Sequence, residues 1–214
     1  MSPLVYIVFI AISFIASFTV YFQSGLNKYV RAFPIFLLCT LAVELMAYHI
    51  GSSGGSPIAL YNCFGPVEFL FYMFLLREVI VGKWMKMIIV YTAGFYTAFI
   101  LIYYIFIQRI SIFSATTYAV GCLLITILCI YYFYELFQSS RAVNLVRQPI
   151  FWICAGLLFF YCCSFPIFGL LNYLNRAPNI IKKNIAVILL LLNVFLYSSF
   201  TIAFLCRIKG KNST

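Results

Sequence analysis

Seven long apolar runs limit what this chain can fold into. Each run has about 20 residues with few charged side chains, which is the length that an α-helix needs to cross a bilayer core roughly 30 Å thick. We predict spans at residues 3–22, 33–50, 59–77, 86–107, 115–137, 149–172 and 184–206. The predicted fold class is an all-α integral membrane protein with seven transmembrane helices. Only short connections remain, so we expect residues 1–214 to form a single membrane domain.

The composition excludes the main soluble classes of protein. Only 8% of the residues are charged, whereas a soluble domain usually carries about 25%. A soluble enzyme, a nucleic-acid-binding domain, a disordered chain and an appended kinase, cyclase or receptor-output domain are therefore excluded, and the lipid bilayer is the first expected partner. The apolar runs are also too long for the alternating strands of a β-barrel. No basic residue precedes the first span, so we expect a retained helix and not a cleavable signal peptide.

Basic residues between the spans predict the orientation of the chain. Ten lysines and arginines lie in the first, third and fifth loops and the C-terminal tail, and four lie on the opposite side. Because basic loops stay in the cytoplasm, the N-terminus is predicted outside and the C-terminus inside. The sixth loop, with three basic residues, is the exception. The net charge of +10 mostly reflects this asymmetry and can also attract anionic lipid headgroups. Compact loops favour a bacterial inner (cytoplasmic) membrane.

No cofactor or metal site is predicted. Nearly all of the eight cysteines lie inside predicted spans, where a cysteine behaves as a small apolar residue. One histidine cannot complete a zinc site at these spacings. The segment Gly51–Gly55 matches the G-x-S-x-G pattern of a nucleophile elbow. That elbow needs a preceding strand, so we interpret the segment as a linker between two membrane helices.

An internal repeat emerges when the chain is shifted by 115 residues against itself. Residues 22–39 then match residues 137–154 at seven of 18 positions, including the segments Pro34–Phe36 and Pro149–Phe151. This predicts two copies, residues 1–80 and 115–207, joined by the linker helix 86–107. Chance agreement in a biased composition is the alternative. Because one linker helix restores the chain direction, the two copies would run parallel.

This layout resembles the three-plus-one-plus-three plan of the SWEET sugar transporters, a plan shared in outline by several small seven-helix transporters and receptors. The resemblance is one of architecture and includes no family signature. The pair Gln148-Pro149 reverses the Pro-Gln dipeptide of the PQ-loop family, and Phe33 precedes Pro34 in the other copy. No site residue is therefore transferred. A microbial rhodopsin is disfavoured because the last span has no lysine beyond its start, at Lys182 and Lys183.

Two carboxylates are predicted to lie inside the membrane. A charged side chain near the bilayer centre costs about 2.5 to 3.5 kcal/mol on insertion scales. Glu44 lies about 9 Å below the outer end of its span and Glu68 about 13 Å below the start of the next one, at 1.5 Å per residue. These similar depths, on consecutive antiparallel helices, suggest a shared site. If the two carboxylates are close, they cannot both stay ionised at low cost.

Further polar residues and two prolines belong to the same zone of the spans 33–50, 59–77, 149–172 and 184–206. Helical spacing places Tyr48 on the face of Glu44, and Tyr61, Gly65 and Tyr72 on the face of Glu68. The candidate substrate- or proton-binding residues are Glu44, Glu68, Tyr48, Tyr72, Asn62 and Asn193. Pro66 and Pro166 are candidate hinges, because each removes a backbone hydrogen bond within a span. For the asparagines and tyrosines a structural hydrogen-bond network is the favoured alternative.

Three functions compete on these observations. The first is a small-molecule or proton-coupled transporter in which Glu44 and Glu68 bind the solute or a proton. The second is a seven-helix sensor or partner-binding subunit, which would pass a signal to a cytoplasmic protein through the basic loops. The third is an intramembrane enzyme acting on lipid with Glu44 or Glu68 as general base, which no nucleophile or metal cluster supports. A homo-oligomer is compatible with each of them.

Overall fold

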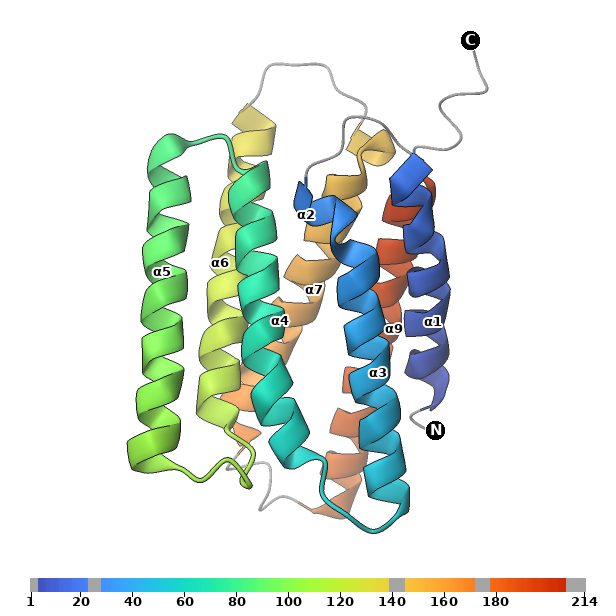
Figure 1. Cartoon of the computed structure of the whole chain (residues 1–214), viewed down its shortest axis with the longest axis vertical. Helices are drawn as coiled ribbons and strands as arrows, with labels where there is room; N and C mark the ends of the chain where they lie inside the picture. The colour runs from blue at the N-terminus through green and yellow to red at the C-terminus, as the bar shows by residue number, and fades with distance from the viewer. Residues whose placement is uncertain (1–3, 23–27, 139–144, 172–177, 207–214) are drawn as a thin grey trace.

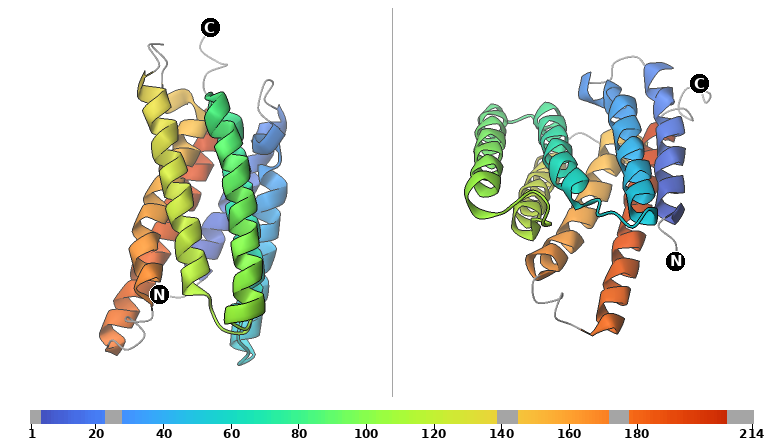
Figure 2. Two further views of the ribbon diagram at one scale, coloured as in Figure 1. Left: turned by 90° about the vertical axis from the view of Figure 1, so that its left-hand side faces the viewer. Right: turned by 60° about the horizontal axis from the view of Figure 1, so that its bottom comes forward.

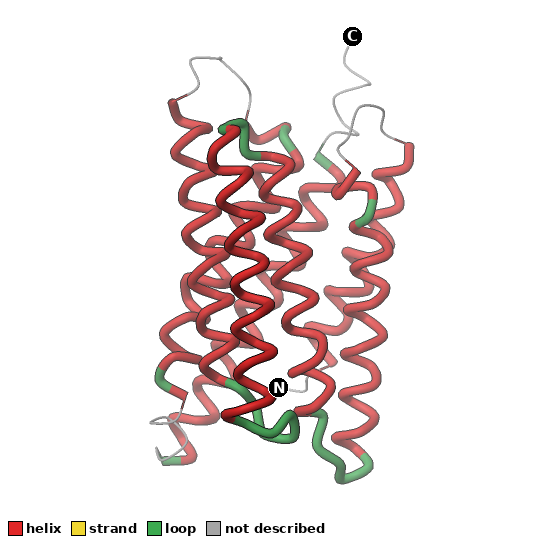
Figure 3. Tube along the Cα trace, turned by 60° about the vertical axis from the view of Figure 1, so that its left-hand side comes forward, coloured by secondary structure: helices red, strands yellow, loops and turns green. Residues whose placement is uncertain are grey.

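The computed structural model describes residues 4–22, 28–138, 145–171 and 178–206, and within them it contains helices and no strands (Figures 1 and 3). The long helices are α1 (Leu4–Ser17), α3 (Phe33–Ser52), α4 (Ile58–Val79), α5 (Lys83–Ile102), α6 (Ala115–Gln138), α7 (Pro149–Gly169) and α9 (Asn179–Leu205). A 3₁₀ helix, η1 (Phe18–Phe22), extends α1, and a π-helix, η2 (Tyr103–Ile107), extends α5. The short helices α2 (Lys28–Arg31) and η3 (Leu145–Arg147) lie between spans.

Prolines mark where four of the long helices begin. Pro34 and Pro149 occupy the first turns of α3 and α7, while Pro57 and Pro178 directly precede α4 and α9. The first backbone N–H groups of a helix have no partner within it, so a proline costs no hydrogen bond there and its fixed φ suits the helix. The turn between α3 and α4 contains Gly54, whose φ of 79° is in the region that favours glycine.

The prediction of seven spans is confirmed. Seven described helices are long and apolar enough to cross a membrane, and their outer faces expose large apolar side chains such as Phe95 (74%) and Phe106 (79%). These features indicate an integral membrane protein. The largest difference from the predicted bounds is at α9, which begins at Asn179 and includes the exposed Lys182 and Lys183. Long basic side chains can extend to water from the end of a helix, so their charge does not end it.

The helices form one bundle with a weak seam. Neighbouring pairs are α4 and α6, α6 and α7, α7 and α9, α9 and α1, and α1 and α3, while α5 packs on α4 at the edge (Figures 1 and 2). The seam lies between α3 and α4, which share few contacts. We call the end with the turn 53–57 and the loop 108–114 the N-terminal end of the bundle. The opposite end, where α4 and α9 finish, is the C-terminal end (Figure 1).

The two predicted copies of the repeat pack differently. In that comparison α1, α3 and α4 correspond to α6, α7 and α9. The pairs α1–α3 and α6–α7 both pack together, but α7 and α9 are in extensive contact where α3 and α4 are not. The internal repeat therefore stays a prediction, and the seam between α3 and α4 has no counterpart in the second half.

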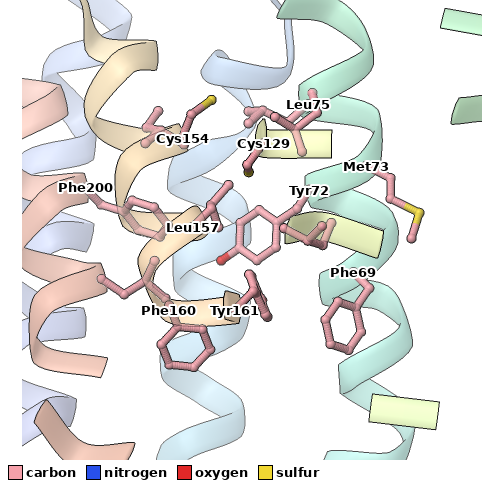
Figure 4. Packing of buried hydrophobic residues seen from close by; sticks show 14 of the residues in the cluster. Phe69, Tyr72, Met73, Leu75, Cys129, Cys154, Leu157, Phe160, Tyr161 and Phe200 are labelled. Carbon is pink, nitrogen blue, oxygen red and sulfur yellow. The ribbon is translucent and has the colours of Figure 1, made fainter. Parts of the chain in front are cut away.

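An aromatic core fills the C-terminal half of the bundle. The rings of Phe36 and Phe71 stack with centroids 4.0 Å apart and join α3 to α4 across the seam. Phe33 makes edge contacts with Phe71, Phe200 and Phe204 at 5.3 to 5.5 Å. Around these rings lie further buried apolar residues, including the free thiols Cys129 and Cys154 (Figure 4). Such edge and offset ring contacts are favourable beyond the area that they bury, so this half is closed.

Candidate functional site

The N-terminal half of the bundle contains a cavity of about 260 Å³. This is far more than the roughly 10 to 15 Å³ that one water needs, and slightly below the roughly 300 Å³ of the smaller ligand pockets. The lining residues are Thr40, Glu44, Tyr61, Phe64, Gly65, Glu68, Phe113, Tyr118, Phe160, Phe168, Leu189, Asn193 and Tyr197. They belong to α3, α4, α6, α7, α9 and the loop before α6. The site therefore depends on helices from both halves of the sequence.

The cavity is located where α3 and α4 separate. On α3 the lining residues follow Phe36, and on α4 they precede Phe71, so both sets lie on the N-terminal side of the stacked pair that joins the helices. On α9 they likewise precede Phe200, which belongs to the same aromatic core. The aromatic core therefore forms the floor of the cavity. Figure 2 (right) shows the helices spread apart at the N-terminal end.

Glu44 is held by two tyrosine hydroxyls from different helices. Tyr6 on α1 donates a hydrogen bond of 2.7 Å to Glu44 Oε2, and Tyr61 on α4 donates one of 3.0 Å to the same atom. All three side chains are half-buried. The two donors fix the carboxyl group of α3 against α1 and α4. The bond from Tyr61 bridges the seam between α3 and α4 on the side of the cavity opposite the aromatic core.

Glu68 also lines this cavity. It lies on α4 two turns after Tyr61, and Tyr161 of α7 donates a hydrogen bond of 3.0 Å to Glu68 Oε1. Tyr161 is fully buried and also packs edge-on against Tyr72 at 5.9 Å. The ring of Tyr161 is thereby fixed in the core while its hydroxyl reaches the carboxyl group at the cavity wall.

The cavity has acidic groups without basic ones. Among the described residues, no lysine or arginine lies within 4 Å of Glu44 or Glu68, and the one ion pair found there is Arg77–Glu78 near the C-terminal end. In the same part of the chain, Glu44 Oε1 and Glu68 Oε2 accept no hydrogen bond. Each carboxyl group therefore keeps one oxygen available to a ligand or to cavity water.

Of the other predicted binding residues, Asn193 also lines the cavity. Its amide donates to the carbonyl of Leu189, four residues earlier on α9, at 2.8 Å. Tyr48 does not line the cavity and is 43% exposed. The last turns of α3 extend past the start of α1 (Figure 1), so sharing a helix face with Glu44 does not bring Tyr48 into the bundle.

Tyr72 lies in the floor below the cavity. It is fully buried in the aromatic core, and its hydroxyl has no hydrogen-bond partner among the described residues. Its side chain extends from α4 toward α7 (Figure 4). A water-accessible role for this residue is therefore not supported by its position, although its hydroxyl is an unsatisfied polar group next to the cavity.

Asn62 is bound to the backbone of the loop before α6. Its amide nitrogen donates to the carbonyls of Ile110 and Ile112 at 2.7 and 2.8 Å, and its oxygen accepts from the backbone of Ser114 at 3.3 Å. The side chain thus fastens the loop between η2 and α6 to α4. It lines a separate hollow of about 10 Å³, and not the large cavity. The position of Asn62 therefore favours a structural hydrogen-bond network, which was the alternative interpretation of the sequence, over a binding role in the large cavity.

The two prolines differ in position. Pro66 lies within α4, between the lining residues Gly65 and Glu68, and borders the small hollow beside Asn62. That hollow is close to the smallest volume that can hold one water. Pro166 lies within the last turn of α7, which ends at Gly169. Pro66 is thus the proline closest to the cavity, whereas Pro166 is at the end of its helix.

Tyr6 and Tyr118 are site residues on spans that the sequence prediction omitted, whereas Tyr161 belongs to the predicted polar zone near Pro166 but not to the predicted binding residues. The predicted zone omitted the first and fifth spans, yet α1 supplies Tyr6 to Glu44 and α6 supplies Tyr118 to the cavity wall. Depth was an available signal, because Tyr6 is near the start of α1 and Glu44 is in the second half of the antiparallel helix α3, so both lie toward the N-terminal end of the bundle. Depth alone does not show toward which neighbouring helix a tyrosine side chain points.

Glu78 and Glu135 have other partners, at the C-terminal end. Arg77 pairs with Glu78 at 3.1 Å. Glu135 accepts backbone hydrogen bonds from Val81 and Gly82 at 2.8 and 3.0 Å, and so binds the turn between α4 and α5. A second hollow at this end, about 370 Å³, is bordered by Arg77, Lys83 and Lys86. The two ends of the bundle therefore differ in charge, with the acidic cavity at one and a basic surface at the other.

Other chemical centres are absent from the part of the chain that the structure describes. No group of three or more His, Cys, Asp or Glu side chains is arranged there to hold a metal ion. Ser53, the central residue of the G-x-S-x-G match, follows the helix α3 and not a strand. Comparison of the chain with known protein families, characterised proteins and solved structures finds no match. The interpretation of the site therefore rests on its geometry.

Proposed function

We propose that this protein is a transporter for a small polar solute, with its N-terminus outside and its C-terminus in the cytoplasm of a bacterial cell. The single observation that carries the proposal is the 260 Å³ cavity with two carboxyl groups from separate helices and no basic partner. Carboxylates inside a membrane are costly, and each typically faces a partner, a water-filled cavity or an ion pathway. Here the cavity is the environment that accounts for both of them.

The closed aromatic floor supports a carrier in an outward-open state. The cavity is on the N-terminal side, and the rings of Phe33, Phe36, Phe71 and Phe200 separate it from the C-terminal end. In an alternating-access cycle, the seam between α3 and α4 would close around the solute while the aromatic floor opens. The few contacts across this seam favour it as the moving interface. Protonation of Glu44 or Glu68 would provide the coupling to a proton gradient.

Uptake by reconstituted protein tests this proposal. Proteoliposomes would be supplied with a panel of labelled amines, amino acids, sugars and carboxylic acids, with and without a pH gradient. Wild-type protein is expected to accumulate at least one solute, and Glu68→Gln is expected to abolish this. Glu78→Gln is the matched control, because it removes the same charge from the C-terminal end. Equal uptake by wild type and Glu68→Gln would contradict the assigned site, and no uptake of any solute would contradict transport.

A sensor is the second candidate, and the closed floor is the observation that favours it. A cavity that ends in a packed aromatic core also suits a receptor that binds a ligand without passing it through. The basic surface of Arg77, Lys83 and Lys86 at the other end would then contact a cytoplasmic protein. Saturable ligand binding by purified protein, combined with no uptake of that ligand, would favour the sensor over the transporter.

A further inference from the structure

We infer that the cavity binds a small organic cation, an amine or quaternary ammonium compound, through Glu44, Glu68 and the surrounding aromatic rings. This inference deepens the proposed function and rests on the same cavity. It specifies the chemical class of ligand from the charge and the aromatic surface of the cavity wall, with two unsatisfied hydroxyl groups behind that wall as a third feature.

Charge is the first feature. Among the described residues, the lining includes two carboxyl groups and no lysine, arginine or histidine. Each carboxyl group has one oxygen held by tyrosine and one without a hydrogen-bond donor among the described residues. A wall of this kind attracts a positive charge and repels an anion, and the interaction is strengthened where the surroundings have a low dielectric constant. An anionic solute would find no basic group among the described lining residues.

The aromatic surface is the second feature. Seven of the thirteen lining residues are aromatic: Tyr61, Phe64, Phe113, Tyr118, Phe160, Phe168 and Tyr197. The face of an aromatic ring carries negative potential, and cages of such rings recognise quaternary ammonium groups. A sugar or another neutral polar solute would instead need many hydrogen-bond partners. Thr40 and Asn193, the neutral aliphatic polar residues of the wall, already donate to carbonyls of their own helices.

Unsatisfied hydroxyl groups beside the cavity are the third feature. Ser164 is fully buried and its hydroxyl has no partner among the described residues. It lies four residues after Phe160 and four before Phe168, so all three share one face of α7, and the two phenylalanines line the cavity. The hydroxyl of Tyr72 is likewise buried and without a partner. Buried polar groups normally have hydrogen-bond partners. These two hydroxyls are enclosed in the packing behind the cavity wall, so they add unsatisfied polar atoms next to the cavity but no contact with its contents.

Calorimetric titration of the purified protein in a neutral detergent tests the inference. Choline is the probe, and 3,3-dimethyl-1-butanol is its uncharged control, because a carbon atom replaces the ammonium nitrogen at nearly the same shape. Choline is expected to bind at least about tenfold more tightly than the alcohol, a difference that corresponds to one favourable charge interaction. Equal binding of the two compounds, or no binding of choline, methylammonium and tetramethylammonium, would overturn the inference.

Variants locate the binding site. Glu44→Gln and Glu68→Gln are each expected to weaken choline binding about tenfold or more, while Glu78→Gln at the far end leaves it within about twofold. Unchanged affinity in both cavity variants would overturn the inference. If a glutamate variant does not fold, Phe160→Leu keeps the carboxylates and removes one ring, and it is expected to weaken choline but not the alcohol. Equal weakening of both compounds would count against a cation site.

This experiment separates the inference from the proposed transport. Choline binding without uptake of any amine into proteoliposomes would support the cation site and contradict transport. If the protein binds no organic cation but takes up a neutral or anionic solute in a Glu68-dependent way, transport would be supported and the cation site would be contradicted.

Discussion

At the scale of single residues, the same side-chain type has different roles according to what it contacts. Asn62 and Asn193 are both asparagines inside spans. Asn62 joins two segments of the chain, because its amide bonds to Ile110, Ile112 and Ser114 across the loop before α6. Asn193 donates only within its own helix, to the carbonyl of Leu189. Without the Asn193 amide, the carbonyl of Leu189 would keep its usual hydrogen bond within the helix. Without the Asn62 amide, backbone groups of the loop before α6 would lose their hydrogen-bond partner.

We therefore expect Asn62→Leu to destabilise the protein far more than Asn193→Leu. The carbonyl of Ile110 and the N–H of Ser114 lose their side-chain partner in the first variant, while the carbonyl of Ile112 keeps Gln108 as a donor. A buried group without a partner costs about 1 to 3 kcal/mol. The melting temperature in detergent should fall clearly for Asn62→Leu and change little for Asn193→Leu. An equal decrease in both variants would show that Asn62 does not fasten the loop.

At the scale of helices, a close approach of α4 and α6 depends on one glycine. A Cβ atom at Gly121 of α6 would lie 2.6 Å from the ring of Phe69 on α4. Phe69 is fully buried and also contacts Tyr96, Tyr118 and Tyr161, so its ring cannot turn aside without disturbing α5, α6 and α7. Small residues of this kind allow membrane helices to approach closely.

Gly121→Ala is accordingly expected to lower stability by about 1 to 3 kcal/mol, as overpacking of a core does. Gly94→Ala in α5 is the matched control, because nothing lies within 4 Å of its added Cβ. Thermal unfolding followed by loss of the monodisperse peak on size exclusion would compare the two. A Gly121→Ala variant as stable as Gly94→Ala would mean that α4 and α6 do not pack as closely as described.

At the scale of the whole molecule, the acidic cavity lies toward the N-terminal end of the bundle, and an aromatic core and a basic hollow lie toward the C-terminal end. The orientation in the membrane stays a prediction, in which the C-terminal end is in the cytoplasm. In that orientation the acidic cavity would face the outside, and the seam between α3 and α4 is part of its wall. The hydrogen bond from Tyr61 to Glu44 at one side and the stacked Phe36–Phe71 pair at the other bridge this seam.

Thiol labelling of intact cells tests the orientation and the opening together. Asn193→Cys, at the cavity wall, should react with a membrane-impermeant maleimide added outside. Phe195→Cys on the same helix should not, because residue 195 is 44% exposed on the outer surface of the bundle, in lipid, where the reactive thiolate does not form. The parent protein with its eight cysteines gives the background. Labelling of Asn193→Cys only after the cells are opened would reverse the proposed orientation.

The sequence by itself determined the seven spans, because about 20 consecutive apolar residues can be buried only by a bilayer or a large core, and it placed Glu44 and Glu68 on two of them. Prolines also mark the starts of α3, α4, α7 and α9, since a proline costs no hydrogen bond in a first turn. Only the tertiary structure decided which partners these residues have. Tyr6 and Tyr161 reach the carboxyl groups, Asn62 turns to a loop and Tyr48 to the outside. Such pairings depend on how each helix is rotated about its axis, and a uniformly apolar span has no polar face to specify that rotation.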